Sequence, residues 1–273
     1  MEAHPQNGGA RVSAAAATEP LLQLEHCTLR FGGLTAVSDL TLALGEHDLV
    51  GLIGPNGAGK TTVFNLITGV YAPTEGSIRY RGASIAGKRP YQITAHGVAR
   101  TFQNSRLFPS LTVFDNVRVA FHLHLEHDAR HSLWRGRGFV RAEKEIDGQV
   151  MEMLDIFHLG QLRDTPAKSL PYGDQRRLEI VRALATRPRL LLLDEPAAGM
   201  NPTEKGGLMK LIEFVEQKYR ISILLVEHDM QVVMGICRRI IVLDYGVKIA
   251  EGAPGAVRAD PKVIEAYLGR EPT

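Results

Sequence analysis

The chain has 273 residues, a length that suits one large α/β domain or two small ones, and its hydrophobic content of 44% is ample for a buried core. The formal net charge of +2 excludes binding to nucleic acid or to a membrane surface through overall charge alone. The two cysteines, Cys27 and Cys237, lie far apart without metal-ligand spacing and favour a reduced, cytosolic protein.

The first twenty residues differ in composition from the rest of the chain. They are rich in Ala, Gly and polar residues, and they lack the basic start and apolar core of a signal peptide. We therefore expect a disordered tail over residues 1–20 and one folded domain over residues 21–273. No apolar run approaches the roughly 18 residues that a membrane-spanning helix needs.

Two alternating stretches, 22–31 and 36–44, predict β-strands joined by a turn at Gly32 and Gly33. Both precede the main motifs, so we expect an antiparallel sheet beside the main one. Phe31, just before the turn, is placed either to stack on an adenine ring or to pack in the core, and the sequence alone leaves both open.

A phosphate-binding pattern, G-x-x-x-x-G-K-[ST], follows the apolar run 49–53 and precedes a predicted helix. Its residues are Gly54, Pro55, Asn56, Gly57, Ala58, Gly59, Lys60, Thr61 and Thr62. The glycines permit a tight turn that points backbone N–H groups at a phosphate, and the helix N-terminus adds its positive dipole end. Lys60 supplies a mobile charge for the outer phosphates, and the Thr61 hydroxyl is suited to ligate Mg²⁺.

Helical patterns interrupt the α/β sequence after a strand within residues 97–104, at whose end Gln103 stands. Thr112 is placed as a helix N-cap, and residues 142–159 carry one apolar stripe at helical spacing. A further long helix is expected over residues 175–185. The sequence therefore predicts a helical subdomain, about residues 104–186, inserted into the α/β core.

Two carboxylates follow four consecutive leucines, residues 190–193, which predict a strand buried on both faces. Asp194 and Glu195 fall at its carboxyl end, where open α/β sheets hold ligands. Asp194 is suited to organise Mg²⁺, and Glu195 to polarise an attacking water. Buried adjacent carboxylates without partners would be costly, which favours a functional role.

The remaining elements continue the α/β pattern to the end of the chain. Residues 205–219 predict a helix and residues 221–226 a buried strand, which places His228 at the same edge as the two carboxylates. There it can sense or hold a terminal phosphate. Residues 240–252 predict a terminal hairpin, and residues 261–268 a short closing helix.

Taken together, the motifs over residues 21–269 resemble the ATP-binding-cassette (ABC) ATPases in order and spacing. The phosphate loop is followed by the family's glutamine at Gln103, its signature at 170–175, its carboxylate strand at 190–195 and its switch histidine at His228. The resemblance implies an α/β fold: a P-loop NTPase (RecA-like) core with an antiparallel β-subdomain and an inserted α-helical subdomain.

The same resemblance implies ATP and Mg²⁺ as cofactors. It implies as catalytic residues Glu195, His228 and Gln103. It implies as metal ligands Thr61, Gln103 and Asp194. Besides the phosphate loop, it implies nucleotide contacts from Phe31, Tyr172, Gly173 and Asp174.

Several longer stretches are similar to the ATPase subunit of branched-chain amino acid importers. They are residues 30–37, 100–103, 176–180, 194–202, 227–230 and 266–269. Lipopolysaccharide-export ATPases and urea or short-chain amide importers share several of these stretches and stay open as alternatives. A soluble ABC protein acting on ribosomes or DNA is the alternative of another class.

The chain departs from the family's usual signature, Leu-Ser-Gly-Gly-Gln. Pro171 replaces the serine, and Tyr172 and Asp174 replace a glycine and the glutamine. Asn201 stands where many relatives carry an aspartate between two subunits. Both changes resemble the importer subgroup's own pattern, so we expect altered tuning of an active enzyme.

The resemblance also implies partners. Two such subunits, identical or related, would hold each ATP between Lys60 of one chain and Gly173 of the other. Transmembrane permease subunits would bind on the helical insertion, where Arg106, Leu107 and Phe108 are candidates for contact or for ordinary packing. A substrate-binding protein would act indirectly, no nucleic acid is expected, and the location implied is the cytoplasmic face of the inner (plasma) membrane, as a peripheral protein.

Overall fold

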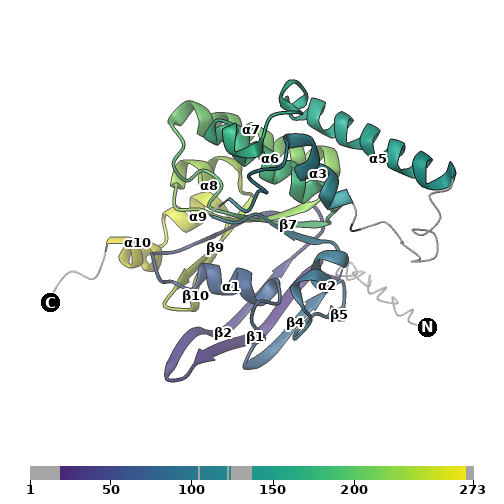
Figure 1. Cartoon of the computed structure of the whole chain (residues 1–273). Helices are drawn as coiled ribbons and strands as arrows, with labels where there is room; N and C mark the ends of the chain where they lie inside the picture. Colours follow the sequence, from purple (N-terminus) through teal and green to yellow (C-terminus); the bar gives the residue numbers. More distant parts are fainter. Residues whose placement is uncertain (1–18, 104, 122, 124–136, 269–273) are drawn as a thin grey trace, which may run out of the picture.

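The computed structural model describes residues 19–103, 105–121, 123 and 137–268 (Figure 1). Of the tail expected over residues 1–20, all but Glu19 and Pro20 lies outside the described residues. Within them, no helix is both long and apolar enough to cross a lipid bilayer. The described residues form two sheets and a layer of helices, packed around two hydrophobic clusters.

A six-stranded sheet forms the centre of the fold. Its strands are β3 (Leu49–Ile53), β6 (Val98–Arg100), β7 (Leu190–Asp194), β8 (Ser222–Val226), β9 (Arg239–Asp244) and β10 (Val247–Gly252). They lie in the order β10-β9-β3-β8-β7-β6, and all neighbours are parallel except the hairpin pair β9 and β10. Every residue of β3, β7 and β8 is buried, as parallel strands covered on both faces require. The carboxyl ends of the parallel strands therefore meet at one edge.

A second sheet is antiparallel throughout, which confirms the expected sheet beside the main one. Its strands are β1 (Leu22–Phe31), β2 (Leu34–Leu44), β4 (Glu75–Tyr80) and β5 (Ala83–Ser84), in the order β2-β1-β4-β5. Strand β2 begins at Leu34, earlier than residue 36, because Leu34 pairs with Phe31 directly across the Gly32–Gly33 turn.

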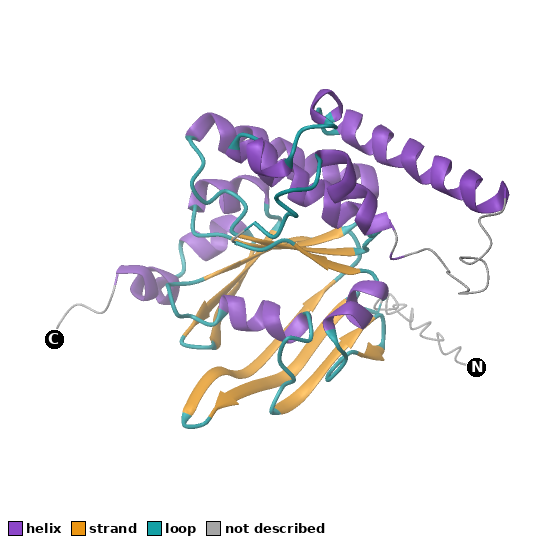
Figure 2. Ribbon diagram, viewed as in Figure 1, coloured by secondary structure: helices purple, strands orange, loops and turns teal. Residues whose placement is uncertain are grey.

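Helix α1 (Lys60–Ile67), which follows the phosphate loop, lies between the two sheets (Figure 2). Its buried Val63 and Phe64 belong to the same hydrophobic cluster as Leu24 of β1 and Leu52 of β3. Burial on two sides gives the helix a rigid seat, and the phosphate loop at its N-terminus is held with it.

The other face of the main sheet is covered by helices (Figure 2). The longer ones are α3 (Val113–Phe121), α5 (Arg137–Ile156), α6 (Tyr172–Ala185) and α7 (Pro202–Tyr219), and the short helix α8 (Met230–Ile236) packs in the same hydrophobic cluster. The apolar stripe expected over residues 142–159 is present on α5, where Ile146, Val150 and Leu154 are buried. Thr112 caps α3 as expected, since its hydroxyl accepts a hydrogen bond from the Asp115 N–H at 3.0 Å.

Short helices account for most of what the sequence patterns missed. They are α2 (Pro90–Ala95), α9 (Pro254–Arg258), α10 (Pro261–Leu268) and the 3₁₀ turns η2 (Gly160–Leu162) and η3 (Ala167–Ser169). Only α10 was expected. Helices α2, α8 and α9 have five to seven residues, too few to show an apolar period.

The signature helix α6 begins at Tyr172, whereas the pattern placed its start at Gln175. Pro171 adopts an extended backbone (φ −53°, ψ 151°), and its carbonyl accepts hydrogen bonds from the N–H groups of Asp174 and Gln175. The helix therefore starts directly after the proline, and Tyr172, Gly173 and Asp174 form its first turn.

Helix α7 also begins earlier than expected, at Pro202 instead of Lys205. The Asn201 side chain accepts from the Glu204 N–H at 3.0 Å, and the Glu204 carboxylate accepts from the Asn201 N–H at 2.9 Å. This reciprocal cap fixes the helix start. Asn201, noted as a departure at a subunit contact, thus has a local role within one chain.

The central strand β7 provides the first prediction. Leu192→Ala should lower the free energy of unfolding by about 2–5 kcal/mol, because Leu192 is fully buried and the smaller side chain leaves a cavity. Urea denaturation measures the change. Val119→Ala, at an exposed position of α3, is the control and should stay within about 0.5 kcal/mol of wild type. Equal losses in the two variants would contradict the placement of β7 in the core.

Candidate nucleotide-binding site

The phosphate loop connects β3 to α1, and backbone contacts on both sides require its glycines. A Cβ atom on Gly54 would lie 2.1 Å from the Leu243 carbonyl oxygen, and one on Gly59 would lie 2.8 Å from that of Ala36. Both residues also have positive φ, 152° and 100°. The backbone of Gly54 in addition hydrogen-bonds the Tyr267 hydroxyl of α10. The loop is therefore fixed by β2, β9 and the last described helix.

The Lys60 ammonium points back into this loop. It donates hydrogen bonds to the carbonyl oxygens of Gly54 at 2.7 Å and Pro55 at 2.8 Å. Burial lowers the pKa of Lys60, and the neighbouring Glu195 and Asp194 act in the opposite direction. The ammonium is already removed from bulk water and held where a phosphate oxygen can replace its carbonyl partners.

A cavity of about 460 Å³ opens over the phosphate loop, a size that suits a small-molecule ligand. Of the predicted site residues it is lined by Phe31, Asn56, Gly57, Ala58, Gly59, Lys60, Thr61, Thr62, Glu195 and His228. Phe31 is 42% exposed and meets the Tyr71 ring edge-on at 5.0 Å, so it is not a core residue. An aromatic face at the rim of this cavity is available for a planar ring.

The three predicted catalytic side chains meet at Glu195. Its carboxylate accepts a hydrogen bond from Gln103 Nε2 at 2.6 Å, and His228 Nε2 lies 2.5 Å from its other oxygen. Glu195 is buried, has a left-handed backbone (φ 49°), and its N–H donates to the Val226 carbonyl at 2.8 Å. A strained residue held by two loops and a neighbouring strand is typical of a functional position.

Asp194, the other carboxylate of the pair, is held by a residue to which the sequence patterns assigned no role. Its Oδ2 atom accepts a hydrogen bond from Arg100 Nη2 at 2.7 Å. Its N–H donates to the Thr101 hydroxyl at 3.4 Å. The signal for Arg100 was present in the sequence, since a cation in the short apolar strand Val98–Arg100 has to find a buried counter-charge.

The signature residues lie apart from the phosphate-loop cavity. Gly173 lines a different cavity, which also contains Arg177 and Glu204. The Tyr172 hydroxyl donates to the Ala198 carbonyl at 2.8 Å, which joins the start of α6 to the loop after Glu195. One chain therefore does not bring its own signature to its own phosphate loop.

Comparisons with known proteins identify the family of this fold and site. The model of the ABC transporter family matches residues 37–198 of the chain. The chain belongs to the ABC transporter family. It is an ATP-hydrolysing enzyme of the P-loop NTPase fold, which confirms the family, activity and fold class expected from the motifs. A second model, described as branched-chain amino acid ATP-binding cassette transporter, matches residues 247–273.

Similar proteins cover nearly the whole chain. The high-affinity branched-chain amino acid transport ATP-binding protein BraF of Pseudomonas aeruginosa is 45% identical over 92% of this chain and 99% of its own length. LivG of Escherichia coli K12, with the same description, is 46% identical over the same shares. Among solved structures, the ADP conformation of the ATP-binding cassette MJ1267 has a TM-score of 0.80, with 29% identity over 93% of this chain and 100% of the other.

The side chains predicted to ligate Mg²⁺ in this ABC ATPase carry the oxygen ligands that the cation prefers. They are the Thr61 hydroxyl, the Asp194 carboxylate and the Gln103 amide oxygen, the Gln103 nitrogen being directed to Glu195. Within the described residues no three His, Cys, Asp or Glu side chains form a metal cluster.

Two further buried side chains connect the loops of the site. Arg176 of α6 donates to the carbonyl oxygens of Phe102 and Gln103 and to the Tyr172 hydroxyl. Glu227 accepts from the Ala197 N–H at 2.6 Å and from the His228 N–H at 3.1 Å, and burial raises its pKa. Arg176 therefore fixes the loop that carries Gln103, here called the glutamine loop, to the signature helix α6.

Glu227 in turn fixes the switch histidine to the loop after Glu195. The sequence patterns assigned no role to Arg176 or Glu227. A glutamate at the end of the fully buried strand β8 was the available signal for the latter, since it too needs partners.

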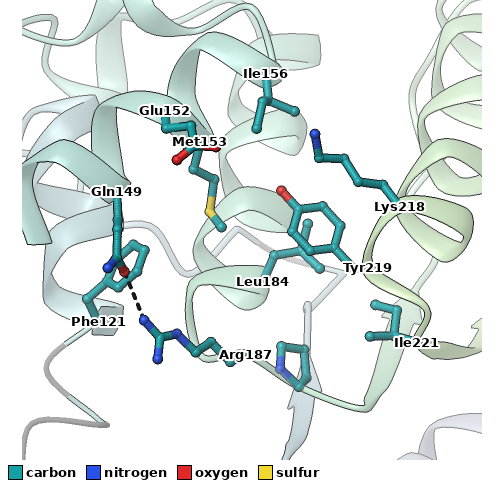
Figure 3. A pocket seen from close by; sticks show the side chains of 11 residues that line it. Phe121, Gln149, Glu152, Met153, Ile156, Leu184, Arg187, Lys218, Tyr219 and Ile221 are labelled. Atoms are coloured by element: carbon teal, nitrogen blue, oxygen red, sulfur yellow. Dashed lines mark hydrogen bonds between the residues drawn. The ribbon is translucent and has the colours of Figure 1, made fainter.

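A second cavity, of about 390 Å³, lies within the helical layer and carries none of the predicted site residues (Figure 3). Side chains of α5, α6 and α7 line it, and Arg187 donates a hydrogen bond to Gln149 across one side at 2.8 Å. The candidate site is therefore the cavity over the phosphate loop.

The Tyr172 hydroxyl gives the second prediction. Tyr172→Phe should lower the free energy of unfolding by about 0.5–1.5 kcal/mol, because the Ala198 carbonyl loses its donor and Arg176 loses an acceptor. Chemical denaturation measures it. Tyr91→Phe, on a side chain that is 62% exposed, is the matched control and should stay within about 0.5 kcal/mol of wild type. A variant at Tyr172 as stable as this control would show that the hydroxyl network contributes nothing.

Proposed function

We propose that this ABC ATPase is the ATP-hydrolysing subunit of an importer of branched-chain amino acids. The convergence of Gln103 and His228 on Glu195, at the cavity over the phosphate loop, carries the assignment of the hydrolytic centre. The cargo is supported by the relatives BraF and LivG, described as branched-chain amino acid transport proteins, and by the family model that matches residues 247–273.

In this proposal the ATP phosphates bind the backbone N–H groups of the phosphate loop and the Lys60 ammonium, and the adenine ring stacks on Phe31. Thr61, Gln103 and Asp194 hold Mg²⁺, which when bound neutralises charge on the outer phosphates. Glu195 orients the attacking water and accepts its proton. The His228 imidazole lies beside Glu195 and contacts the terminal phosphate, and Glu227 fixes the His228 backbone.

The complete site forms between two subunits. Gly173 does not line the phosphate-loop cavity of its own chain, and it stands, half-buried, in the first turn of α6, whose N-terminus favours an anion. Tyr172, Gly173 and Asp174 then contact the ATP bound to the partner. The ATP-binding cassette MJ0796, described as dimeric and bound to ADP and phosphate, shares the fold with a TM-score of 0.71 and 24% identity. Hydrolysis turns one bridging anion into two that repel each other, and the dimer opens.

The segment before α3 is the proposed contact for transmembrane permease subunits at the cytoplasmic face of the plasma membrane. Phe108 is exposed, with the Arg182 guanidinium 5.7 Å from its ring centre. The buried Asn116 fixes this segment, accepting from the Phe108 N–H at 2.8 Å and donating to the Phe108 carbonyl at 3.1 Å. Arg106 packs on Phe102, one residue before Gln103, so the segment is connected to the nucleotide site.

Glu195→Gln gives the third prediction. The variant should bind ATP with wild-type affinity and form a lasting dimer, while turnover falls about 100-fold or more, because an amide cannot accept the proton from water. Phosphate release and size-exclusion chromatography with ATP measure the two effects. Glu213→Gln, an exposed change of the same chemistry, should keep wild-type turnover. Normal hydrolysis in Glu195→Gln would refute the role of Glu195.

Affinity purification of the tagged protein from its own membranes tests the transport assignment. We expect two hydrophobic permease subunits and a second, related ATPase to co-purify, together with ATP-dependent uptake of leucine, isoleucine or valine by reconstituted vesicles. A lipopolysaccharide-export partner, an amide-specific importer or ribosomes in the same preparation would each replace the proposal by the corresponding alternative.

A further inference from the structure

The Arg100 guanidinium is buried between three parts of the nucleotide site. Its side chain is 6% exposed and that of Asp194 4%, and the two form an ion pair at 2.7 Å. On the side of α1, Arg100 Nη1 donates to Asn65 Oδ1, also at 2.7 Å. The rings of Phe64 and Phe102 lie 5.3 and 4.9 Å from its Cζ atom. The cation is thus held by the phosphate-loop helix and by the segment that leads to the glutamine loop.

Only the two Nη atoms of the Arg100 guanidinium have hydrogen-bond acceptors. Arg100 Nε is buried and has no hydrogen-bond partner among the described residues. An unsatisfied buried donor costs free energy, so the Nε atom does not explain where the guanidinium lies. The contacts with Asp194 and Asn65 do explain it. This arrangement therefore keeps the positive charge of Arg100 next to the Asp194 carboxylate.

The two consecutive carboxylates, Asp194 and Glu195, each have a neighbouring cation before any nucleotide enters. Lys60 interacts electrostatically with both Asp194 and Glu195, and Arg100 is paired with Asp194. Both consecutive carboxylates therefore face a cation. A divalent cation approaching Asp194 meets these two positive charges, and one oxygen of Asp194 is already engaged. The phosphates of a nucleotide supply the negative charge that changes this balance.

We propose that Arg100 is the counter-ion of Asp194 and makes divalent-metal binding conditional on nucleotide, so that the metal enters the site only together with the phosphates. Arg100 is in this role a positioning and charge-balancing residue, with no contact to the reacting atoms. The inference rests on the proposed metal site at Thr61 and Asp194. It adds to that site the order in which nucleotide and metal bind.

The experiment measures Mn²⁺ binding to the nucleotide-free protein and to its ADP complex by electron paramagnetic resonance. Wild type should bind Mn²⁺ only with ADP. Arg100→Met removes the charge but fills the space between the two rings, and it should bind Mn²⁺ without nucleotide about tenfold or more tightly than wild type. Arg100→Lys keeps the charge and should behave as wild type. Arg100→Met combined with Asp194→Asn should lose the nucleotide-free site.

ADP affinity in excess chelator should be the same in wild type and Arg100→Met, which shows that the phosphate loop is intact. If Arg100→Met does not fold, Arg100→Gln gives the same comparison with a neutral polar side chain. Nucleotide-free Mn²⁺ binding that is equal in wild type and the neutral variant would overturn the role of Arg100. Failure of wild type to bind Mn²⁺ even with ADP would instead refute the proposed metal site.

Discussion

Two consecutive carboxylates at the end of a strand buried on both faces are the constraint around which the site is built. Neither Asp194 nor Glu195 can remain ionised there without partners, because desolvating a lone carboxylate costs several kcal/mol. Each partner comes from a different element: Arg100 ends β6, Gln103 follows it, and His228 follows β8. The sheet order β8-β7-β6 places these elements on both sides of β7. The contacts that compensate the two carboxylates are thus the same contacts that assemble the hydrolytic centre.

The sequence predicted those parts of the site whose chemistry is local in the chain. The phosphate loop with its strand and helix is a short contiguous pattern, and Asp194 and Glu195 follow four leucines directly. The supporting contacts are different, because they join distant positions. Arg100 and Asp194 are 94 residues apart, and Arg176 and Phe102 are 74 apart. No period or spacing within either segment encodes such a pair. Helix starts at Tyr172 and Pro202 were misplaced because caps at Pro171 and Asn201 decide them, and apolar spacing does not report caps.

The departures in the signature acquire a physical meaning from this network. Tyr172 stands where relatives of the usual pattern carry glycine, and its hydroxyl binds both Arg176 and the Ala198 carbonyl. Arg176 in turn binds the backbone of Phe102 and Gln103. The signature helix, the glutamine loop and the loop after Glu195 are therefore joined by a chain of hydrogen bonds. A displacement of α6 therefore has to move all three or break this network.

Strand β3, which leads into the phosphate loop, is synthesised before the strands that pair with it. β3 is made early on the ribosome, yet its two neighbours, β8 and β9, come from residues 222–244, and Tyr267 contacts Gly54 later still. Until then both edges of β3 have no native partner strand, and unpaired edges invite aggregation. A nascent or truncated chain that ends before β8 contains the complete phosphate-binding motif but lacks the strand pairing that holds the phosphate-binding site in place.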